Sequence, residues 1–174
     1  DRLSLLVNEV YNHPSDYAGL TFVVATIFFA FQIYCDFSGY SSIAIGSARV
    51  MGYNLMQNFN MPYLAVSIKD FWQRWHISLS TWFRDYVYIP MRGNRVRKWR
   101  WYYNIFITFL LSGVWHGANW TYVIWGSLHG FYFIAGSILF SGKKFERISE
   151  TVPSAMMTLI KRLLIFVLVC FAWI

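Results

Sequence analysis

Charge is what this sequence has least of. Charged residues make up 13% of its 174 residues, about half of the ~25% that is usual for soluble domains. Residues 101–140 contain no Asp, Glu, Lys or Arg at all. With 57% hydrophobic and 21% aromatic residues, one soluble core of this size could not hide so much apolar surface. The composition therefore excludes a soluble globular domain and indicates a membrane protein.

Several familiar motifs are also missing. The two cysteines, Cys35 and Cys170, form no Cys-x-x-Cys pair and have no zinc spacing, so we interpret them as small packed hydrophobes. Gly46 and Gly52 lack the Gly-Lys-Ser/Thr ending of a phosphate loop, and no dinucleotide fingerprint is present. No carboxylate lies at ligand spacing from His76, His116 or His129, so no metal site is expected.

The net charge of +7 does not indicate a nucleic-acid partner. Five positive residues fall between Arg92 and Arg100, just before the uncharged stretch, and Lys143, Lys144 and Arg147 follow just after it. Basic residues beside apolar spans fit the positive-inside rule and contact with lipid headgroups. Both basic ends can lie in the cytoplasm only if the stretch between them crosses the membrane an even number of times.

The apolar runs predict an all-α, polytopic membrane bundle. Residues 17–35 could form a first span, which we expect Asp36 and the small residues after it to break; Asp36 would cap the helix or line a polar cavity. Residues 101–140 would extend ~60 Å as helix, or two hydrocarbon thicknesses, so we predict a hairpin reversing at residues 117–119. A last span would begin after Arg162.

Other segments lack the character of a span. Residues 1–16 are polar with a turn at 12–15, and residues 54–62 predict a loop. Residues 64–88 mix charges with aromatics, which is typical of helices in the membrane interface or at the edge of a bundle. We therefore expect four or five membrane segments in a single domain over residues 1–174, forming part of a longer protein.

Two histidines lie in the uncharged stretch, each within a Gly-x-x-His-Gly unit. Ionisable groups at that depth are by default a functional hypothesis. Beside His116, Trp115 and Trp120 offer rigid walls for a substrate and Asn119 offers a hydrogen-bond partner. The residues alone leave two interpretations of His116 open: a reactive group, or an imidazole that bonds to a backbone carbonyl beside a packing motif. For His129 the packing role is favoured.

A third histidine, His76, lies in a segment rich in aromatic and charged residues. Ser80 follows one helical turn later, within reach of a side-chain contact. Arg74 and Arg84 could neutralise an anionic ligand, and Asp85 could orient a base or pair with either arginine. The alternative is an interfacial helix with solvated salt bridges. No Ser-His-Asp triad can be assembled from sequence order, because such triads are recognised by geometry.

Four runs are specific enough to indicate a family: YCDFSGYSSIAIGSARVMGY, NFNMPYLAVSIKDFWQRWHISLSTWFRDYVYIP, GNR and SGVWHGANWTYVIWGSLHG. Over about residues 31–133 they closely resemble the membrane-bound O-acyltransferase family, in the branch of bacterial alginate O-acetylation proteins. D-alanyl-lipoteichoic acid synthesis proteins are similar but more distant. Residues 91–93 read Met-Arg-Gly where relatives tend to have Leu-Gly-Gly, in a loop to which we assign no chemistry.

The resemblance implies a multi-pass enzyme of the bacterial inner membrane that moves an acyl group to a hydroxyl. It implies that His116 of the WHG motif is catalytic and that His76 occupies the second polar position, often Asn in eukaryotic relatives. No cofactor would be tightly bound; the co-substrate would be an acyl thioester, acetyl-coenzyme A or an acyl carrier. Partners would be membrane lipid, the donor, and an alginate-like polysaccharide or an extracytoplasmic acetyltransferase that completes transfer.

The family fold is a ring of helices around a thin centre open to both faces, in proteins about twice as long, with the N-terminal half absent here. We hypothesise that His116 takes the proton of the acceptor hydroxyl and that His76 positions or polarises the acyl carbonyl. The Arg92–Arg100 loop would face phosphates of the donor or of lipid. Alternatives are D-alanyl transfer to teichoic acid, a transporter or channel lined by His116 and His129, and a non-catalytic scaffold.

Overall fold

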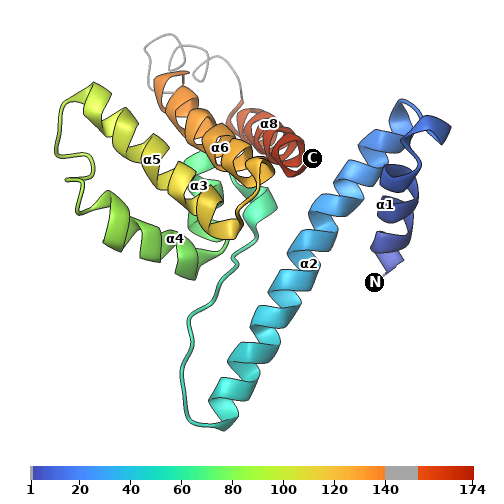
Figure 1. The fold of residues 1–174 in the computed structure, drawn as a ribbon, viewed down its shortest axis with the longest axis horizontal. Coiled ribbons are helices and arrows are strands. Elements are labelled where there is room, and N and C mark those ends of the chain that lie inside the picture. The colour runs from blue at the N-terminus through green and yellow to red at the C-terminus, as the bar shows by residue number, and fades with distance from the viewer. Residues whose placement is uncertain (1, 140–152) are drawn as a thin grey trace. The chain divides into compact units, whose positions relative to one another are not determined.

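A computed structural model describes residues 2–139 and 153–174, and every regular element in these ranges is helical (Figure 1). The predicted all-α class is confirmed. The chain divides into two compact units, Asp1–Asn58 with Val167–Ile174, and Phe59–Phe166. The basic residues predicted to follow the uncharged stretch, Lys143, Lys144 and Arg147, lie outside the described residues.

The first unit begins with a helix that the sequence did not lead us to expect. Helix α1 (Arg2–Asn12) packs on α2 (Leu20–Val50) and buries Val7 and Val10. The Tyr11 hydroxyl and Thr26 Oγ1 share a hydrogen bond of 2.9 Å across this contact. Leucine or valine at positions 3, 6, 7 and 10 has helical spacing, which the surrounding polar residues obscured. The turn predicted at residues 12–15 is confirmed by a short 3₁₀ helix, η1 (Pro14–Asp16).

The expected break at Asp36 is wrong. Helix α2 continues through this position for 31 residues, and Asp36 lies exposed near its middle. Serine and glycine disfavour a helix by only about 1 kcal/mol or less each, and no proline in α2 removes a backbone donor. The many apolar residues on both sides sustain the helix, so Asp36 does not cap one.

Three described helices are long and apolar enough to cross a membrane, namely α2, α6 (Trp120–Leu139) and α8 (Ser154–Trp173). The protein is therefore a multi-pass membrane protein. Among the described residues this is fewer than the four or five segments expected. Helix α5 (Lys98–His116) is not apolar enough to count as a span, because Lys98 and Arg100 lie in its first turn and its apolar residues are largely aromatic.

The predicted hairpin is confirmed, since α5 ends at His116 and α6 begins at Trp120. The two helices lie side by side in the second unit (Figure 1). The loop predicted at residues 54–62 is also confirmed, and it leads into a 3₁₀ turn, η2 (Pro62–Leu64).

Residues 64–88 form short helices, as expected: α3 (Ile68–Arg74), α4 (Ile77–Phe83) and one π-helical turn, η3 (Arg84–Tyr88). Helix α3 packs into the second unit through one face, while Lys69 and Gln73 are exposed. This helix contacts α6, and Phe71 is fully buried, with Trp72 close to it in burial. Aromatic side chains of this segment, Phe71, Trp72 and Trp75, form part of the core of the second unit.

Candidate active site

The break between α3 and α4 places His76 in an unusual backbone conformation. Ser67 caps α3 by accepting a hydrogen bond from Asp70 N, and Trp75 ends the helix in an extended conformation. His76 then adopts φ 43° and ψ 56°, in the left-handed region. Such a conformation is uncommon for a residue with a side chain and is found disproportionately at functional sites. It turns the chain so that α4 can begin at Ile77.

The environment of His76 favours its neutral form. The side chain is half-buried, and burial is the main cause that lowers its pKa from 6.5 to about 4. The charge that His116 would carry lowers this pKa further. The two histidines predicted to be catalytic are therefore close enough to interact electrostatically, although one lies in the break before α4 and the other ends α5.

His116 is the last residue of α5 and has an exposed side chain surrounded by aromatic rings. Its ring centroid lies 5.0 Å from that of Trp125, with the planes at 80°. Tyr122 stacks on it at 6.2 Å and 25°. Trp115 lies 5.1 Å from His116 and 6.5 Å from His76, measured between ring centroids. Trp115, predicted as a wall of the site, thus contacts both histidines.

His129 is fully buried beneath this arrangement. Its ring lies 5.0 Å from Trp72 and 4.9 Å from Trp125, and nearly parallel to Phe71 at 6.5 Å. The packing role predicted for His129 agrees with this position. We call these rings, together with those around His116, the aromatic cluster: Phe71, Trp72, Trp115, Tyr122, Trp125, His76, His116 and His129.

Two of the predicted site residues lie in the hairpin turn beyond His116. Asn119 accepts a hydrogen bond of 3.2 Å from the backbone N of Thr121 through its side-chain oxygen, which supports the start of α6. Trp120 is 78% exposed. Both residues lie at the turn of the α5–α6 hairpin. Their contact with a substrate stays a prediction.

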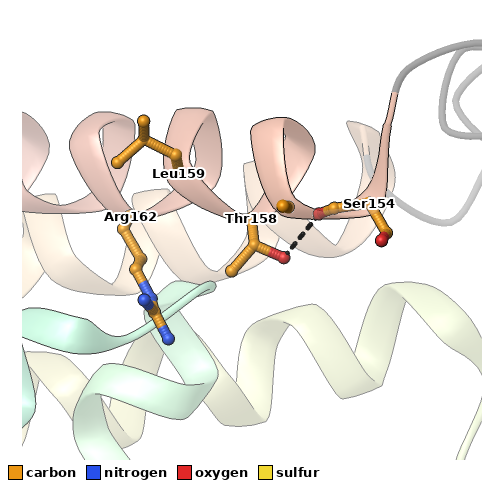
Figure 2. A pocket seen from close by; sticks show the side chains of 5 residues that line it. Ser154, Thr158, Leu159 and Arg162 are labelled. Atoms are coloured by element: carbon orange, nitrogen blue, oxygen red, sulfur yellow. Dashed lines mark hydrogen bonds between the residues drawn. The ribbon is translucent and has the colours of Figure 1, made fainter.

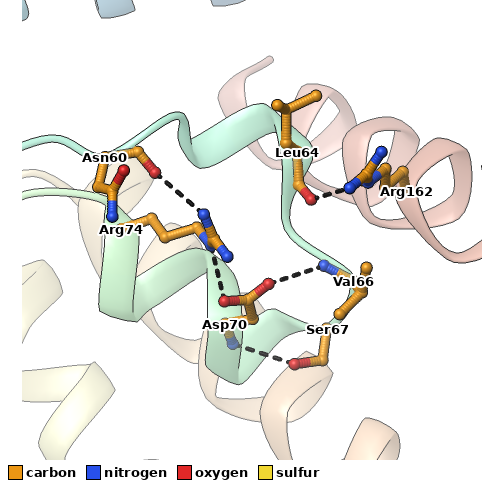
Figure 3. Close-up of polar contacts among 7 residues, drawn as sticks. All are labelled: Asn60, Leu64, Val66, Ser67, Asp70, Arg74 and Arg162. Atoms are coloured by element: carbon orange, nitrogen blue, oxygen red, sulfur yellow. Dashed lines mark hydrogen bonds and ion pairs between the residues drawn. The ribbon is translucent and has the colours of Figure 1, made fainter. Parts of the chain in front are cut away.

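Arg74 belongs to a polar network that holds the segment before α3 (Figure 3). Its Nε donates to Asp70 Oδ1 at 2.7 Å, and its Nη1 donates to the carbonyl of Asn60 at 3.4 Å. The other carboxylate oxygen of Asp70 accepts from Val66 N at 3.0 Å. Arg162 of α8 donates to the carbonyl of Leu64 at 3.2 Å. These contacts agree with the salt-bridge alternative for Arg74.

Arg84 and Asp85 pair with each other on the surface. Nε of Arg84 donates to Oδ1 of Asp85 at 2.7 Å, and Nη2 donates to Oδ2 at 3.2 Å. This bond raises the pKa of Arg84 and lowers the pKa of Asp85. Ser80 donates to the carbonyl of Trp75 at 3.3 Å, so its hydroxyl reaches the backbone at the break before His76. The substrate-binding roles of these three residues stay predictions.

Asn104 was not among the residues predicted to shape the site. This residue is fully buried two turns into α5, and its Nδ2 donates to the carbonyls of Met91 and Gly93, each at 2.9 Å. It therefore clamps the turn in which Arg92 and Gly93 both have positive φ, at 70° and 53°. Asn104 is the one side-chain amide in α5, and this polar group among apolar residues was the signal that could have identified it.

A shallow hollow lies on α8, away from these groups in sequence (Figure 2). Its lining residues are Ser154, Ala155, Thr158, Leu159 and Arg162, and Thr158 Oγ1 donates to the carbonyl of Ser154 at 2.8 Å. No predicted site residue lines it. The chemistry is therefore to be sought at the aromatic cluster and not at this hollow.

Comparison with known proteins gives a consistent result. A model described as the membrane-bound O-acyltransferase family, MBOAT, matches residues 8–173. The probable alginate O-acetylase AlgI of Pseudomonas aeruginosa is 49% identical over 132 residues, 76% of this chain and 25% of that protein. The protein of the same name from Azotobacter vinelandii is 58% identical over 99 residues, 57% of this chain and 20% of that protein.

A third relative has a different name. The peptidoglycan O-acetyltransferase of Helicobacter pylori is 49% identical over 114 residues, which are 64% of this chain and 22% of that protein. The chain thus spans about a quarter of the length of the curated relatives it matches. This is less than the half that the resemblance led us to expect.

Proposed function

The chain belongs to the membrane-bound O-acyltransferase family, and on that premise we propose that it forms part of an enzyme acetylating an exported polysaccharide. The acetyl group would come from a thioester on the cytoplasmic side of the bacterial inner membrane. Three relatives carry names that describe O-acetylation, two with alginate and one with peptidoglycan as the modified polymer. An alginate-like acceptor, reached directly or through an extracytoplasmic partner enzyme, is our first choice.

One observation carries the assignment of roles. His76 lies in the break before α4 and His116 at the end of α5, yet Trp115 contacts both rings and the charge of His116 lowers the pKa of His76. A hydroxyl is a poor nucleophile at neutral pH, and a neutral imidazole is suited to accept its proton. Two imidazoles at one place offer a base for the acceptor and an N–H donor for the acyl oxygen.

The acyl transfer is a substitution at the thioester carbonyl carbon. His116 accepts the hydroxyl proton while the acceptor oxygen forms a bond to the thioester carbonyl carbon. His76 donates a hydrogen bond to the carbonyl oxygen as negative charge develops there. The carbon–sulfur bond then breaks, the ester leaves, and the proton passes to the thiolate. General-base assistance typically accelerates such a step ~10²–10⁴-fold, or about 3–5 kcal/mol of barrier.

The test is acetyl transfer by the full-length protein in membranes supplied with a radiolabelled acetyl thioester and polysaccharide acceptor. We expect His116→Ala to abolish transfer and His76→Ala to reduce it strongly, with normal membrane insertion of both. His13→Ala is the matched control, because this histidine is exposed just after α1 and its side chain contacts Glu9, away from His76 and His116 in sequence. Near-normal transfer by His116→Ala would disprove the assignment.

The same assay separates the enzyme from a transporter. Turnover of labelled donor into ester requires acyl chemistry, whereas a channel lined by the same histidines would show solute flux in liposomes without ester formation. Ester formation that depends on His116 excludes the second function.

A further inference from the structure

His116 needs support that its own helix does not provide. It is the last residue of α5, and its side chain is exposed. An exposed side chain at a helix end can exchange among several rotamers. A general base must lie within ~2.6–3.2 Å of the proton it accepts, so an unrestrained ring would spend much of its time out of position.

Trp125 of α6 restrains the ring from the neighbouring helix. The two ring centroids are 5.0 Å apart and the planes are at 80°, an edge-to-face arrangement that aromatic rings favour. Gly126 is in close backbone contact with Gly113 of α5, so the residue next to Trp125 fixes the distance between the helices. Trp125 is therefore held beside the end of α5.

The indole is itself anchored in the core. Its centroid lies 4.9 Å from that of His129 and 5.7 Å from that of Trp72, and both of these side chains are buried. The other two rings beside His116 lack this anchorage, because Trp115 and Tyr122 are exposed by 59% and 42%. Of these three neighbours, Trp125 is the one that joins His116 to the buried part of the aromatic cluster.

We propose that Trp125 is a positioning residue that orients the His116 imidazole for proton transfer through their edge-to-face contact. The inference rests on the function proposed above, since orientation matters only if His116 reacts. Trp125 itself does not exchange a proton. Small misplacements of a reacting group can lower a rate by about 10²-fold, so the contact acts on turnover and not on donor binding.

The experiment measures kcat and KM for the acetyl thioester in the full-length protein. We expect Trp125→Leu to lower kcat about 10- to 100-fold with KM changed by less than about twofold. Trp125→Phe keeps an aromatic ring on His116, so it should retain most of kcat. Phe133→Leu, which removes a half-buried ring from the same helix, is the control and should behave as the unmodified protein.

A second measurement does not depend on activity. Diethyl pyrocarbonate modifies accessible imidazoles, and mass spectrometry reports its rate at each histidine. In Trp125→Leu we expect modification of His116 to become several-fold faster while modification of His13 stays constant. Unchanged His116 reactivity, or a kcat equal to that of Phe133→Leu, would overturn the positioning role.

Outcomes that concern folding are also decisive. If Trp125→Leu does not accumulate, Trp125→Met replaces it, because methionine fills the volume without a ring. Loss of both variants while Phe133→Leu accumulates would assign Trp125 a structural role and refute the proposal. An unmodified protein without transfer activity would instead refute the proposed function, and the modification rates would still test the contact.

Discussion

Gly113 and Gly126 approach each other across the α5–α6 hairpin so closely that neither position has room for a side chain. A β-carbon on Gly126 would lie 3.1 Å from the Cα of Gly113, and one on Gly113 would collide with the carbonyl oxygen of Tyr122. Small residues allow helices in lipid to approach in this way. Because His116 and Trp125 lie within one turn of these glycines, the glycine contact determines how the two rings meet.

Substitution of either glycine therefore should destabilise the hairpin. We expect Gly113→Ala or Gly126→Ala to lower stability by about 1–3 kcal/mol, since backbone atoms must move to admit the methyl group. Gly46→Ala on α2 is the control, because a β-carbon there meets nothing within 4 Å and alanine favours the helix by up to about 1 kcal/mol. Thermal inactivation in detergent measures the difference, and equal losses at positions 126 and 46 would contradict it.

The pKa of His76 predicts a dependence of stability on pH. Burial lowers the folded-state pKa to about 4 from 6.5, so between these values the unfolded chain binds a proton that the folded chain does not. Stability should therefore be fully present above pH 6.5 and decrease as pH falls toward 4. In His76→Gln the fall in melting temperature between pH 7 and pH 4.5 should be smaller. Identical slopes for His76→Gln and for the exposed-site control His13→Gln would show that position 76 does not contribute.

Comparing variants of Arg74 and Asp70 tests whether Arg74 has a structural role, a donor-binding role, or both. We expect Arg74→Ala and Asp70→Ala to lower stability non-additively, with a coupling of about 0.5–3 kcal/mol, because the two side chains form one ion pair at 2.7 Å. If Arg74 also binds the anionic donor, as the sequence predicts, only Arg74→Ala should raise KM. A rise in KM in both variants would instead trace the effect to the network around residues 60–74.

Asn104 should control the order of the basic loop. Asn104→Leu removes two hydrogen bonds to the turn at residues 91–93 and leaves its carbonyls without the buried amide, at a cost of about 1–3 kcal/mol. We expect faster trypsin cleavage after Arg92 and Arg95. Asn94→Ala, an exposed change in the same loop, should leave the cleavage rate unaltered. If both variants are cleaved at the same rate, Asn104 does not hold the loop.

The helical hairpin shows what could be predicted and why. A run of apolar residues as long as two bilayer crossings must form helices, because the backbone has no other hydrogen-bond partners in lipid, and Gly117 to Asn119 is where it reverses. The break predicted at Asp36 failed for a related reason. The low helix propensity of the serine and glycine residues after Asp36 costs only about 1 kcal/mol or less each. The many apolar residues of α2 on both sides of this position outweigh that cost.

The positions of His76, Trp125 and Asn104 relative to other groups could not be derived from periodicity. Each depends on a contact between separate elements: His76 with Trp115, Trp125 with His116, and Asn104 with the turn before α5. Such contacts form only when several elements pack at once.

The sequence alone determined that this is a helical membrane protein, which histidines could react, and where the chain turns between α5 and α6. These properties follow from local composition and from the hydrogen-bonding demands of lipid. Only the tertiary structure decided that α3 buries Phe71 and Trp72, that three histidines share one aromatic cluster, and that Trp125 contacts two of them. The physical reason is that close packing between elements, here through Gly113 and Gly126, depends on shapes that no single segment of the chain contains.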